Sequence, residues 1–175
     1  MTSRIFNRRL IAVVLAVFTA VSFVRAQDVP VGALIGQSLS KLEQDASPEA
    51  FQNCIAELKR IDAMAPGMAA PKYYIALQSL NFAVTNPHAE QAESLIAEAE
   101  QAISQLEEIK DFDQSDLCTL KGFLYMVRIV QDPARNGQRY YLDVMDYYEK
   151  ALKLNPDNAL ARQLQEKFFE GMRAQ

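Results

Sequence analysis

Residues 147–161 read Tyr-Tyr-Glu-Lys-Ala-Leu-Lys-Leu-Asn-Pro-Asp-Asn-Ala-Leu-Ala and contain the end of one helix and the start of the next. Helical spacing puts Tyr148, Ala151 and Leu152 on one apolar face. Asn155-Pro156 then ends the helix, because proline cannot continue it and disfavours helical geometry in the preceding residue. A second apolar stripe follows the proline at once. The stretch therefore predicts two helices joined by a tight turn, as in an array of helical hairpins.

The same alternation of apolar stripes and breaks continues through the chain from residue 33. Glycine is sparse, regular alternation of β-branched residues is absent, and Ala, Leu, Glu, Gln and Lys dominate, so we expect an all-α fold. The apolar stripes predict helices over residues 33–42, 51–64, 73–84, 92–109, 117–127, 140–154 and 157–172. Ser47-Pro48 is expected to start the second helix and Asn86-Pro87 the fourth. These helices would form about three antiparallel pairs and a C-terminal capping helix.

The quoted stretch resembles the second helix of a tetratricopeptide repeat, with Tyr148, Ala151 and Pro156 at the aromatic, small and proline positions. In the same frame Gly122 and Tyr125 take the small and aromatic positions of a first helix. The chain departs from the family pattern in having no tryptophan, a long helix over 92–109 and a long link over 131–139. The resemblance implies an α-α superhelix that binds a partner and does not catalyse a reaction.

Three segments carry a narrower resemblance, to small secreted or periplasmic tetratricopeptide-like proteins of the Bacteroidota. They are residues 71–77, 132–140 and 151–156. This second resemblance covers most of the chain after the leader. It implies no enzymatic activity and names no partner.

Residues 1–26 have the pattern of a signal peptide. Arg4, Arg8 and Arg9 precede an uncharged run over residues 10–24, and Val24-Arg25-Ala26 supplies small residues for cleavage after Ala26. The run of 15 residues is short for a membrane span, which needs about 20. We therefore expect a periplasmic or secreted protein, and the alternative is an uncleaved N-terminal membrane anchor.

Residues 27–175 would then form one helical-repeat domain with a strongly acidic balance. The full chain has 18 basic and 22 acidic residues, and residues 1–26 hold four arginines and no acid, so 14 basic residues remain against 22 acidic, a net charge of −8. This balance argues against nucleic acid as a partner, since such partners need a clustered basic surface. Membrane contact is expected only if the N-terminal segment stays uncleaved. A protein or a peptide is the expected partner.

The chain lacks the residue patterns of an enzyme, a cofactor site or a metal site. His88 is the only histidine, and we expect it at the surface. Asp111, Asp113 and Asp116 lack the glycine and the distal glutamate of a calcium loop, so a solvated turn between helices is the better interpretation. No glycine-rich phosphate loop or nucleophile elbow is present. We predict a protein without catalytic activity, cofactor or metal.

The two cysteines allow two interpretations. In an oxidising compartment, Cys54 and Cys118 would form a disulfide that contributes roughly 4 kcal/mol. They belong, however, to helices separated by a whole hairpin, and stacked hairpins would hold their Cα atoms beyond the roughly 7 Å that a disulfide allows. We favour two reduced, buried thiols.

The first candidate binding surface is a concave groove lined by the first helices of successive pairs. In the repeat frame, apolar and aromatic residues would point into it: Tyr73, Tyr74, Leu77, Thr119, Leu120 and Phe123. Exposed tyrosines would suit capture of an apolar peptide or a partner helix. The alternative is that these residues belong to the core.

The second candidate surface is the link over residues 131–139. Arg135 and Arg139, with Asn136-Gly137 at the tip of an inserted loop, would present two guanidinium groups to an acidic or phosphate-bearing partner. The other interpretation, which we favour, is that both arginines pair with Asp132, Asp143 or Asp146 and hold the link against the helix over residues 140–154, because these acidic residues lie within helical reach.

These two surfaces correspond to two functions. The groove predicts a protein-interaction module of the cell envelope. The arginine loop predicts an accessory or regulatory subunit of an envelope enzyme or transport complex. Exposure of Tyr73 and Tyr74 would favour the groove, and their burial, with an ordered and exposed arginine segment, would favour the second surface.

Overall fold

The computed structural model describes residues 30–173, and these residues form seven α-helices and no strand. The expected all-α fold is confirmed, whereas the predicted signal peptide, residues 1–26, lies outside the described residues. In chain order the helices are α2 (Val31–Gln44), α3 (Pro48–Met64), α4 (Ala69–Thr85), α5 (Ala92–Glu107), α6 (Gln114–Gln131), α7 (Pro133–Leu154) and α8 (Ala159–Arg173).

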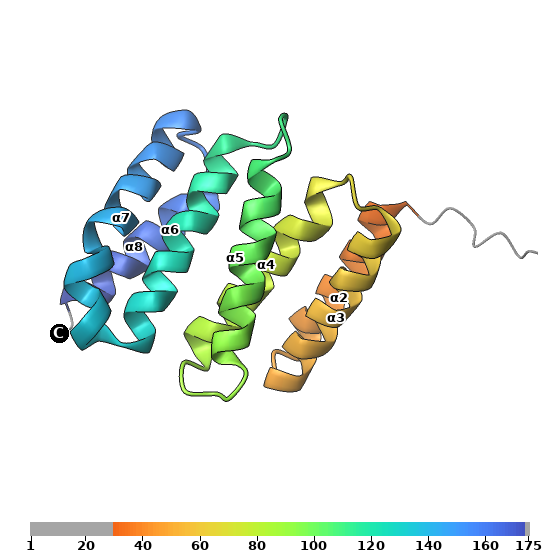
Figure 1. Cartoon of the computed structure of the whole chain (residues 1–175), viewed down its shortest axis with the longest axis horizontal. Coiled ribbons are helices and arrows are strands. Elements are labelled where there is room, and N and C mark those ends of the chain that lie inside the picture. The colour runs from red at the N-terminus through yellow and green to blue at the C-terminus, as the bar shows by residue number, and fades with distance from the viewer. Residues whose placement is uncertain (1–29, 174–175) are drawn as a thin grey trace, which may run out of the picture. The chain divides into compact units, whose positions relative to one another are not determined.

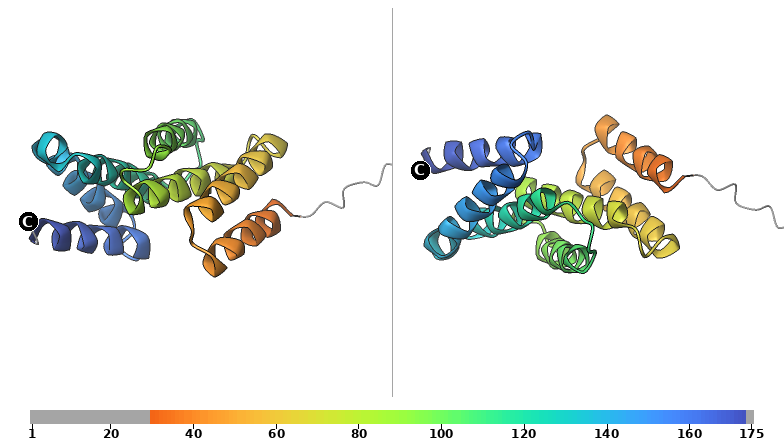
Figure 2. Two further views of the ribbon diagram at one scale, coloured as in Figure 1. Left: turned by 90° about the horizontal axis from the view of Figure 1, so that it is seen from below. Right: turned by 90° about the horizontal axis from the view of Figure 1, so that it is seen from above.

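The helices pack as three antiparallel pairs in a row, α2 with α3, α4 with α5, and α6 with α7 (Figure 1). The last helix, α8, packs against α6 and α7, as expected of a capping helix. Views from below and above show α5 on one side of this row and α2 and α8 on the other (Figure 2). Helix α6 contacts α4, α5, α7 and α8, so it is the most enclosed element of the array.

Two helix starts follow from capping side chains. Ser47 Oγ accepts a hydrogen bond from the Ala50 N–H at 3.2 Å, and Pro48 occupies the first turn of α3, as the sequence predicts. Asp113 Oδ1 accepts from the N–H groups of Ser115 and Asp116, at 2.7 and 3.0 Å, and starts α6. One of the three clustered aspartates is thus a helix cap.

Two expected boundaries are wrong. Asn86-Pro87 does not start α5, because residues 87–91 form turns and the helix begins at Ala92, where its apolar stripe begins. Residues 133–139 are no loop, because they form the first two turns of α7. Asp132 caps this helix and Pro133 follows it, so the pair acts as Ser47-Pro48 does in α3.

The contact between α6 and α7 depends on a glycine. A Cβ atom added to Gly122 would lie 2.8 and 2.9 Å from two ring carbons of Tyr148, which is fully buried. Only hydrogen at this position lets the Tyr148 ring reach the α6 backbone. Ala151, one turn further along α7, is also fully buried. The small and aromatic positions assigned from the sequence therefore meet in space.

A buried polar network fixes α8 against this pair. Asn158 caps α8 by accepting a hydrogen bond from the Ala161 N–H at 3.0 Å. Its side-chain nitrogen donates to Ser115 Oγ at 2.9 Å and to Asp116 Oδ1 at 3.0 Å. Ser115 Oγ donates in turn to the Ala151 carbonyl at 2.8 Å. Because these buried polar groups have hydrogen-bond partners, the network orients α8 against α6 and α7.

Candidate functional site

An arginine-lined pocket lies where α6 ends and α7 begins, beside the start of α5. Its volume is about 350 Å³, and its lining includes three arginines from two helices. The lining residues are Glu93, Glu100, Arg128, Gln131, Asp132, Arg135, Asn136, Arg139 and Tyr140. Both arginines of the second predicted surface therefore belong to one concave site.

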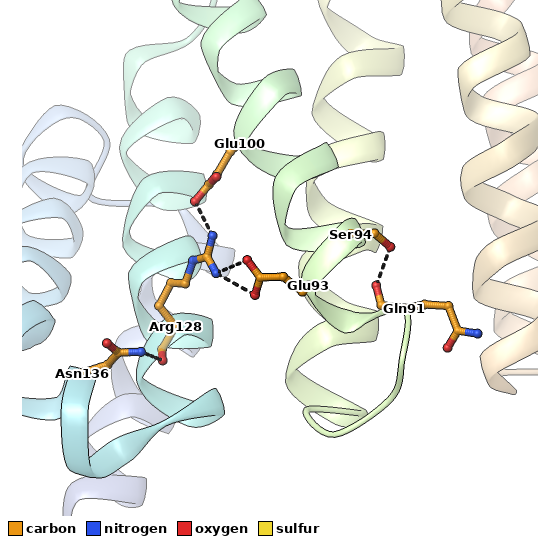
Figure 3. A network of polar contacts seen from close by, with 6 residues as sticks. All are labelled: Gln91, Glu93, Ser94, Glu100, Arg128 and Asn136. Atoms are coloured by element: carbon orange, nitrogen blue, oxygen red, sulfur yellow. Dashed lines mark hydrogen bonds and ion pairs between the residues drawn. The ribbon is translucent and has the colours of Figure 1, made fainter.

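The turn between α6 and α7 positions this site through two hydrogen-bonding side chains. Asp132 Oδ1 accepts from the Arg135 N–H at 3.1 Å. Asn136 Nδ2 donates to the Arg128 carbonyl at 2.7 Å, which satisfies a carbonyl at the end of α6 (Figure 3). The segment that bears the arginines is thereby rigid and helical.

Arg128 has a structural role in the pocket. Its Nη1 donates to both carboxylate oxygens of Glu93, at 2.8 and 2.9 Å, and its Nη2 donates to Glu100 at 2.9 Å (Figure 3). Partial burial opposes the charge of Arg128, but the hydrogen bonds to Glu93 and Glu100 outweigh it and raise the pKa of the guanidinium group. Two carboxylates thus neutralise this cation and join α5 to α6.

Arg135 and Arg139 differ from Arg128 because their side chains are exposed. They lie one turn apart on α7, and among residues 30–173 neither forms an ion pair. The alternative pairing with Asp132, Asp143 or Asp146 is wrong for this part of the chain, since Asp146 pairs with Lys150 at 2.6 Å. The Arg139 guanidinium lies 4.9 Å from the ring centre of Tyr140. Two positive charges therefore face solvent beside a concave surface.

The predicted groove is only partly a surface. Leu120 is 0% exposed and Phe123 is 1% exposed, so neither offers surface to a partner. Thr119 is also buried and donates a hydrogen bond to the Ser115 carbonyl at 2.8 Å. The assignment of Leu120 and Phe123 to partner binding is wrong because α6, which carries them, has neighbouring helices on most of its sides.

Tyr73, Tyr74 and Leu77 are half-buried on α4 and pack against the core. The Tyr73 ring meets the Tyr74 ring edge-on at 5.1 Å and lies 6.3 Å from Phe112. Burial, and then the nearby carboxylate of Asp116, raise the pKa of Tyr73 well above the usual value for a tyrosine. These rings therefore contribute mainly to packing, and a carboxylate lies near Tyr73.

The lone histidine and the possible metal ligands form no metal site in the described part of the chain. His88 is exposed. Within residues 30–173, no three His, Cys, Asp or Glu side chains gather as metal ligands would. None of the helices α2–α8 combines the length and apolar character needed to cross a bilayer.

Both cysteines are free, Cys54 buried and Cys118 partly exposed. Burial is the main cause that raises the pKa of each thiol, and the carboxylate of Glu57 adds to the effect at Cys54. Neither thiol is therefore activated as a nucleophile. The expectation of a buried thiol is confirmed for Cys54, and it is wrong for Cys118.

Arg128 and Tyr140 were missed as members of the site. The sequence carried no signal for them, because Arg128 lies on α6 and meets the arginines and Tyr140 of α7 only through the non-helical turn at Asp132. In comparisons with protein-family models, curated proteins and solved structures, nothing matches this chain. The geometry of the site therefore carries the functional conclusion.

Proposed function

We propose that this chain is a non-catalytic interaction module of the cell envelope that holds an acidic segment of a partner protein at Arg135 and Arg139. The observation that carries the proposal is the pair of exposed guanidinium groups, unpaired among the described residues, on a rigid helix beside a pocket. Two guanidinium groups one turn apart match carboxylates two residues apart on an extended segment, because alternate side chains of such a segment share a face. The partner would be an envelope enzyme or transport complex, with this chain as its accessory or regulatory subunit.

We also propose that the chain is a tetratricopeptide-like protein, and its row of helix pairs supports this assignment. The contact between Gly122 and Tyr148 is the kind of tight inter-helix packing that the small and aromatic positions of such repeats provide. Export through a cleaved N-terminal signal places the module in the periplasm or outside the cell. Arrays of helix pairs act by presenting extended surfaces to partners, and no catalytic constellation is needed for that role.

A second candidate function is peptide binding by a patch on α4. Tyr73, Tyr74 and Leu77 each keep part of their surface exposed, and tyrosine rings are strong contact residues in interfaces. This patch would hold an apolar peptide. The burial of Leu120 and Phe123 removes the other wall of the predicted groove, so the arginine site is the better supported of the two.

The arginine proposal is tested with a fluorescein-labelled hexaglutamate peptide in an anisotropy titration. The Arg135→Gln/Arg139→Gln variant is expected to bind the peptide roughly tenfold or more weakly than the wild type, because each charge-assisted contact contributes about 1 kcal/mol or more. Salt is expected to weaken wild-type binding. The matched control is Arg60→Gln/Lys110→Gln, which removes two exposed positive charges from α3 and from the turn before α6.

Each outcome decides the proposal. Wild-type affinity in the control and reduced affinity in the pocket variant support it. Equal losses in both variants would show a general charge effect, and undetectable binding by the wild type would also overturn it. Loss of binding only in a Tyr73→Ala variant, tested with an apolar peptide, would assign the function to α4.

A further inference from the structure

Three tyrosines form a row of neighbouring rings across the junction of α6 and α7. The Tyr125 ring from α6 lies 5.1 Å from Tyr140 and 5.7 Å from Tyr147, both on α7, and it stacks on Tyr147 with an interplanar angle of 13°. All three are half-buried, so each ring shows part of its surface. The row continues from the arginine pocket, because Tyr140 also lines that pocket.

Cations stand at both ends of this tyrosine row. Arg139 lies over the ring of Tyr140 at 4.9 Å. At the other end Lys121 and Lys150 each lie 5.6 Å from the ring centre of Tyr147. Arg139 and Lys150 are eleven residues apart on α7, close to three full turns, so they share a face and are separated by about 16 Å along the axis.

Both lysines at the Tyr147 end of the row already have an ion-pair partner. Lys150 pairs with Asp146 at 2.6 Å, and both side chains are more than half exposed. Lys121 pairs with Glu107. The exposed pair of Lys150 and Asp146 adds little stability, so a partner's carboxylate can replace Asp146.

A polyanion such as nucleic acid does not fit this surface. Several carboxylates flank the tyrosine row and the pocket, and they would repel a continuous chain of phosphates. These carboxylates are Glu93, Glu100, Glu107, Asp143 and Asp146. The surface instead suits separated negative charges with apolar groups between them.

We propose that the tyrosine row is a binding strip for an extended partner segment with acidic side chains four or six residues apart and aromatic residues between them. The separation of about 16 Å corresponds to about five residues of an extended chain, which rises about 3.3 Å per residue. Because alternate side chains share a face, the acidic residues must be an even number apart. The aromatic residues would pack on the exposed parts of the three rings. The inference rests on the proposed function and extends it, because one acidic end would occupy Arg135 and Arg139.

The test uses the absence of tryptophan from this chain, so that a tryptophan in a peptide reports binding by its fluorescence. Probe one is a seven-residue segment with Glu at positions 1 and 7 and with Trp and Phe at positions 3 and 5, so that all four side chains share one face of an extended peptide. Probe two keeps the Glu residues and one Trp but replaces the other inner residues with Gly. We expect probe one to bind roughly fivefold or more tightly than probe two, as one additional aromatic contact contributes about 1 kcal/mol.

Variants on the strip locate the binding. Tyr147→Ala is expected to remove the preference for probe one, while Leu142→Ala, at a side chain that is 75% exposed on another face of α7, keeps it. Asp143 lies close enough to Tyr125 to raise the pKa of that phenol, behind the larger effects of burial and Tyr147. Asp143→Asn should therefore tighten both probes about two- to fivefold by removing a repulsive charge, a gain that misfolding cannot produce.

The outcomes separate the two proposals. If both probes bind equally and Tyr147→Ala and Asp143→Asn change neither, the strip is overturned, while loss of binding in Arg135→Gln/Arg139→Gln keeps the arginine site. If neither probe binds the wild type, the strip is overturned, and the hexaglutamate titration alone decides the arginine site. Preference for probe one that is lost in Tyr147→Ala and kept in Leu142→Ala supports the strip.

Discussion

The molecule has two tyrosine clusters, and they differ in their neighbours. On α4, Tyr73 packs against Tyr74 and Phe112 and lies near the carboxylates of Asp113 and Asp116. On α6 and α7, the tyrosine row instead stands between cations at both ends. The same residue type thus stabilises one surface and is available to a partner on the other, and the elements packed around each ring decide which role it has.

The largest expected difference between the clusters is in stability. Tyr73→Ala should lower the free energy of unfolding by about 2 to 3 kcal/mol, because it removes a half-buried ring from contacts with Tyr74 and Phe112. Tyr147→Ala should cost less, about 1 kcal/mol, since the Tyr147 ring stacks on Tyr125 but, unlike Tyr73, does not pack against the hydrophobic core. Urea unfolding of the two variants checks this. Equal losses would contradict the division into a packing cluster and a binding cluster.

A smaller effect is expected from the glycine that lets α7 approach α6. Gly122→Ala should destabilise the protein by about 1 to 2 kcal/mol, because the overpacking against Tyr148 exceeds the gain in helix propensity. The variant should also weaken binding of probe one, since the tyrosine row depends on how α6 and α7 meet.

Gly137→Ala is the matched control, in a helix with nothing within 4 Å of the added Cβ atom. It should stabilise the protein by about 0.5 to 1 kcal/mol. If the contact with Tyr148 is as tight as the structure shows, thermal or urea unfolding will show a loss of stability in Gly122→Ala and a gain in Gly137→Ala. A gain in stability for both variants would disprove it.

The helices and their pairing were predictable because they depend on local spacing. The period of apolar residues placed Tyr148 and Ala151 inside, and both are fully buried. Ser47-Pro48 gave the start of α3 correctly. Asp132-Pro133 carried the same signal, but Asn136-Gly137 led to the prediction of a loop. In the structure Asn136 bonds back to the Arg128 carbonyl while it remains in α7, so this turn-forming residue stabilises the end of the previous helix.

The tyrosine row was not predictable, because it depends on the register between two helices. Tyr147 and Tyr148 are adjacent in sequence, and their helical spacing separates an outer from an inner position. Nothing in that spacing shows that Tyr125, on another helix, will stack on Tyr147. The burial of Leu120 and Phe123 was hidden for a related reason, since it follows from the number of helices that surround α6.

The smallest expected effect concerns alkaline pH and contrasts Tyr73 with Tyr125. The pKa of each phenol is raised mainly by burial; Asp116 adds to the shift at Tyr73, whereas Lys121 opposes it at Tyr125. A raised pKa in the folded state means that the unfolded state loses its proton first. Stability is therefore unaffected below about pH 10 and falls above it, by at most about 1.4 kcal/mol per pH unit for each tyrosine.

Between about pH 10 and 11, the free energy of unfolding should therefore fall less steeply with pH in Tyr73→Phe than in Tyr125→Phe. Urea unfolding of both variants and of the wild type at several alkaline pH values measures the slopes. Because each substitution removes only a hydroxyl group, packing at neutral pH stays nearly constant and serves as the internal control. The comparison would be reversed if Tyr125→Phe reduced the pH dependence of the free energy of unfolding more than Tyr73→Phe does. In that case the more strongly desolvated ring would lie on the α6–α7 surface. The ring on α4 would then be the one available to a partner.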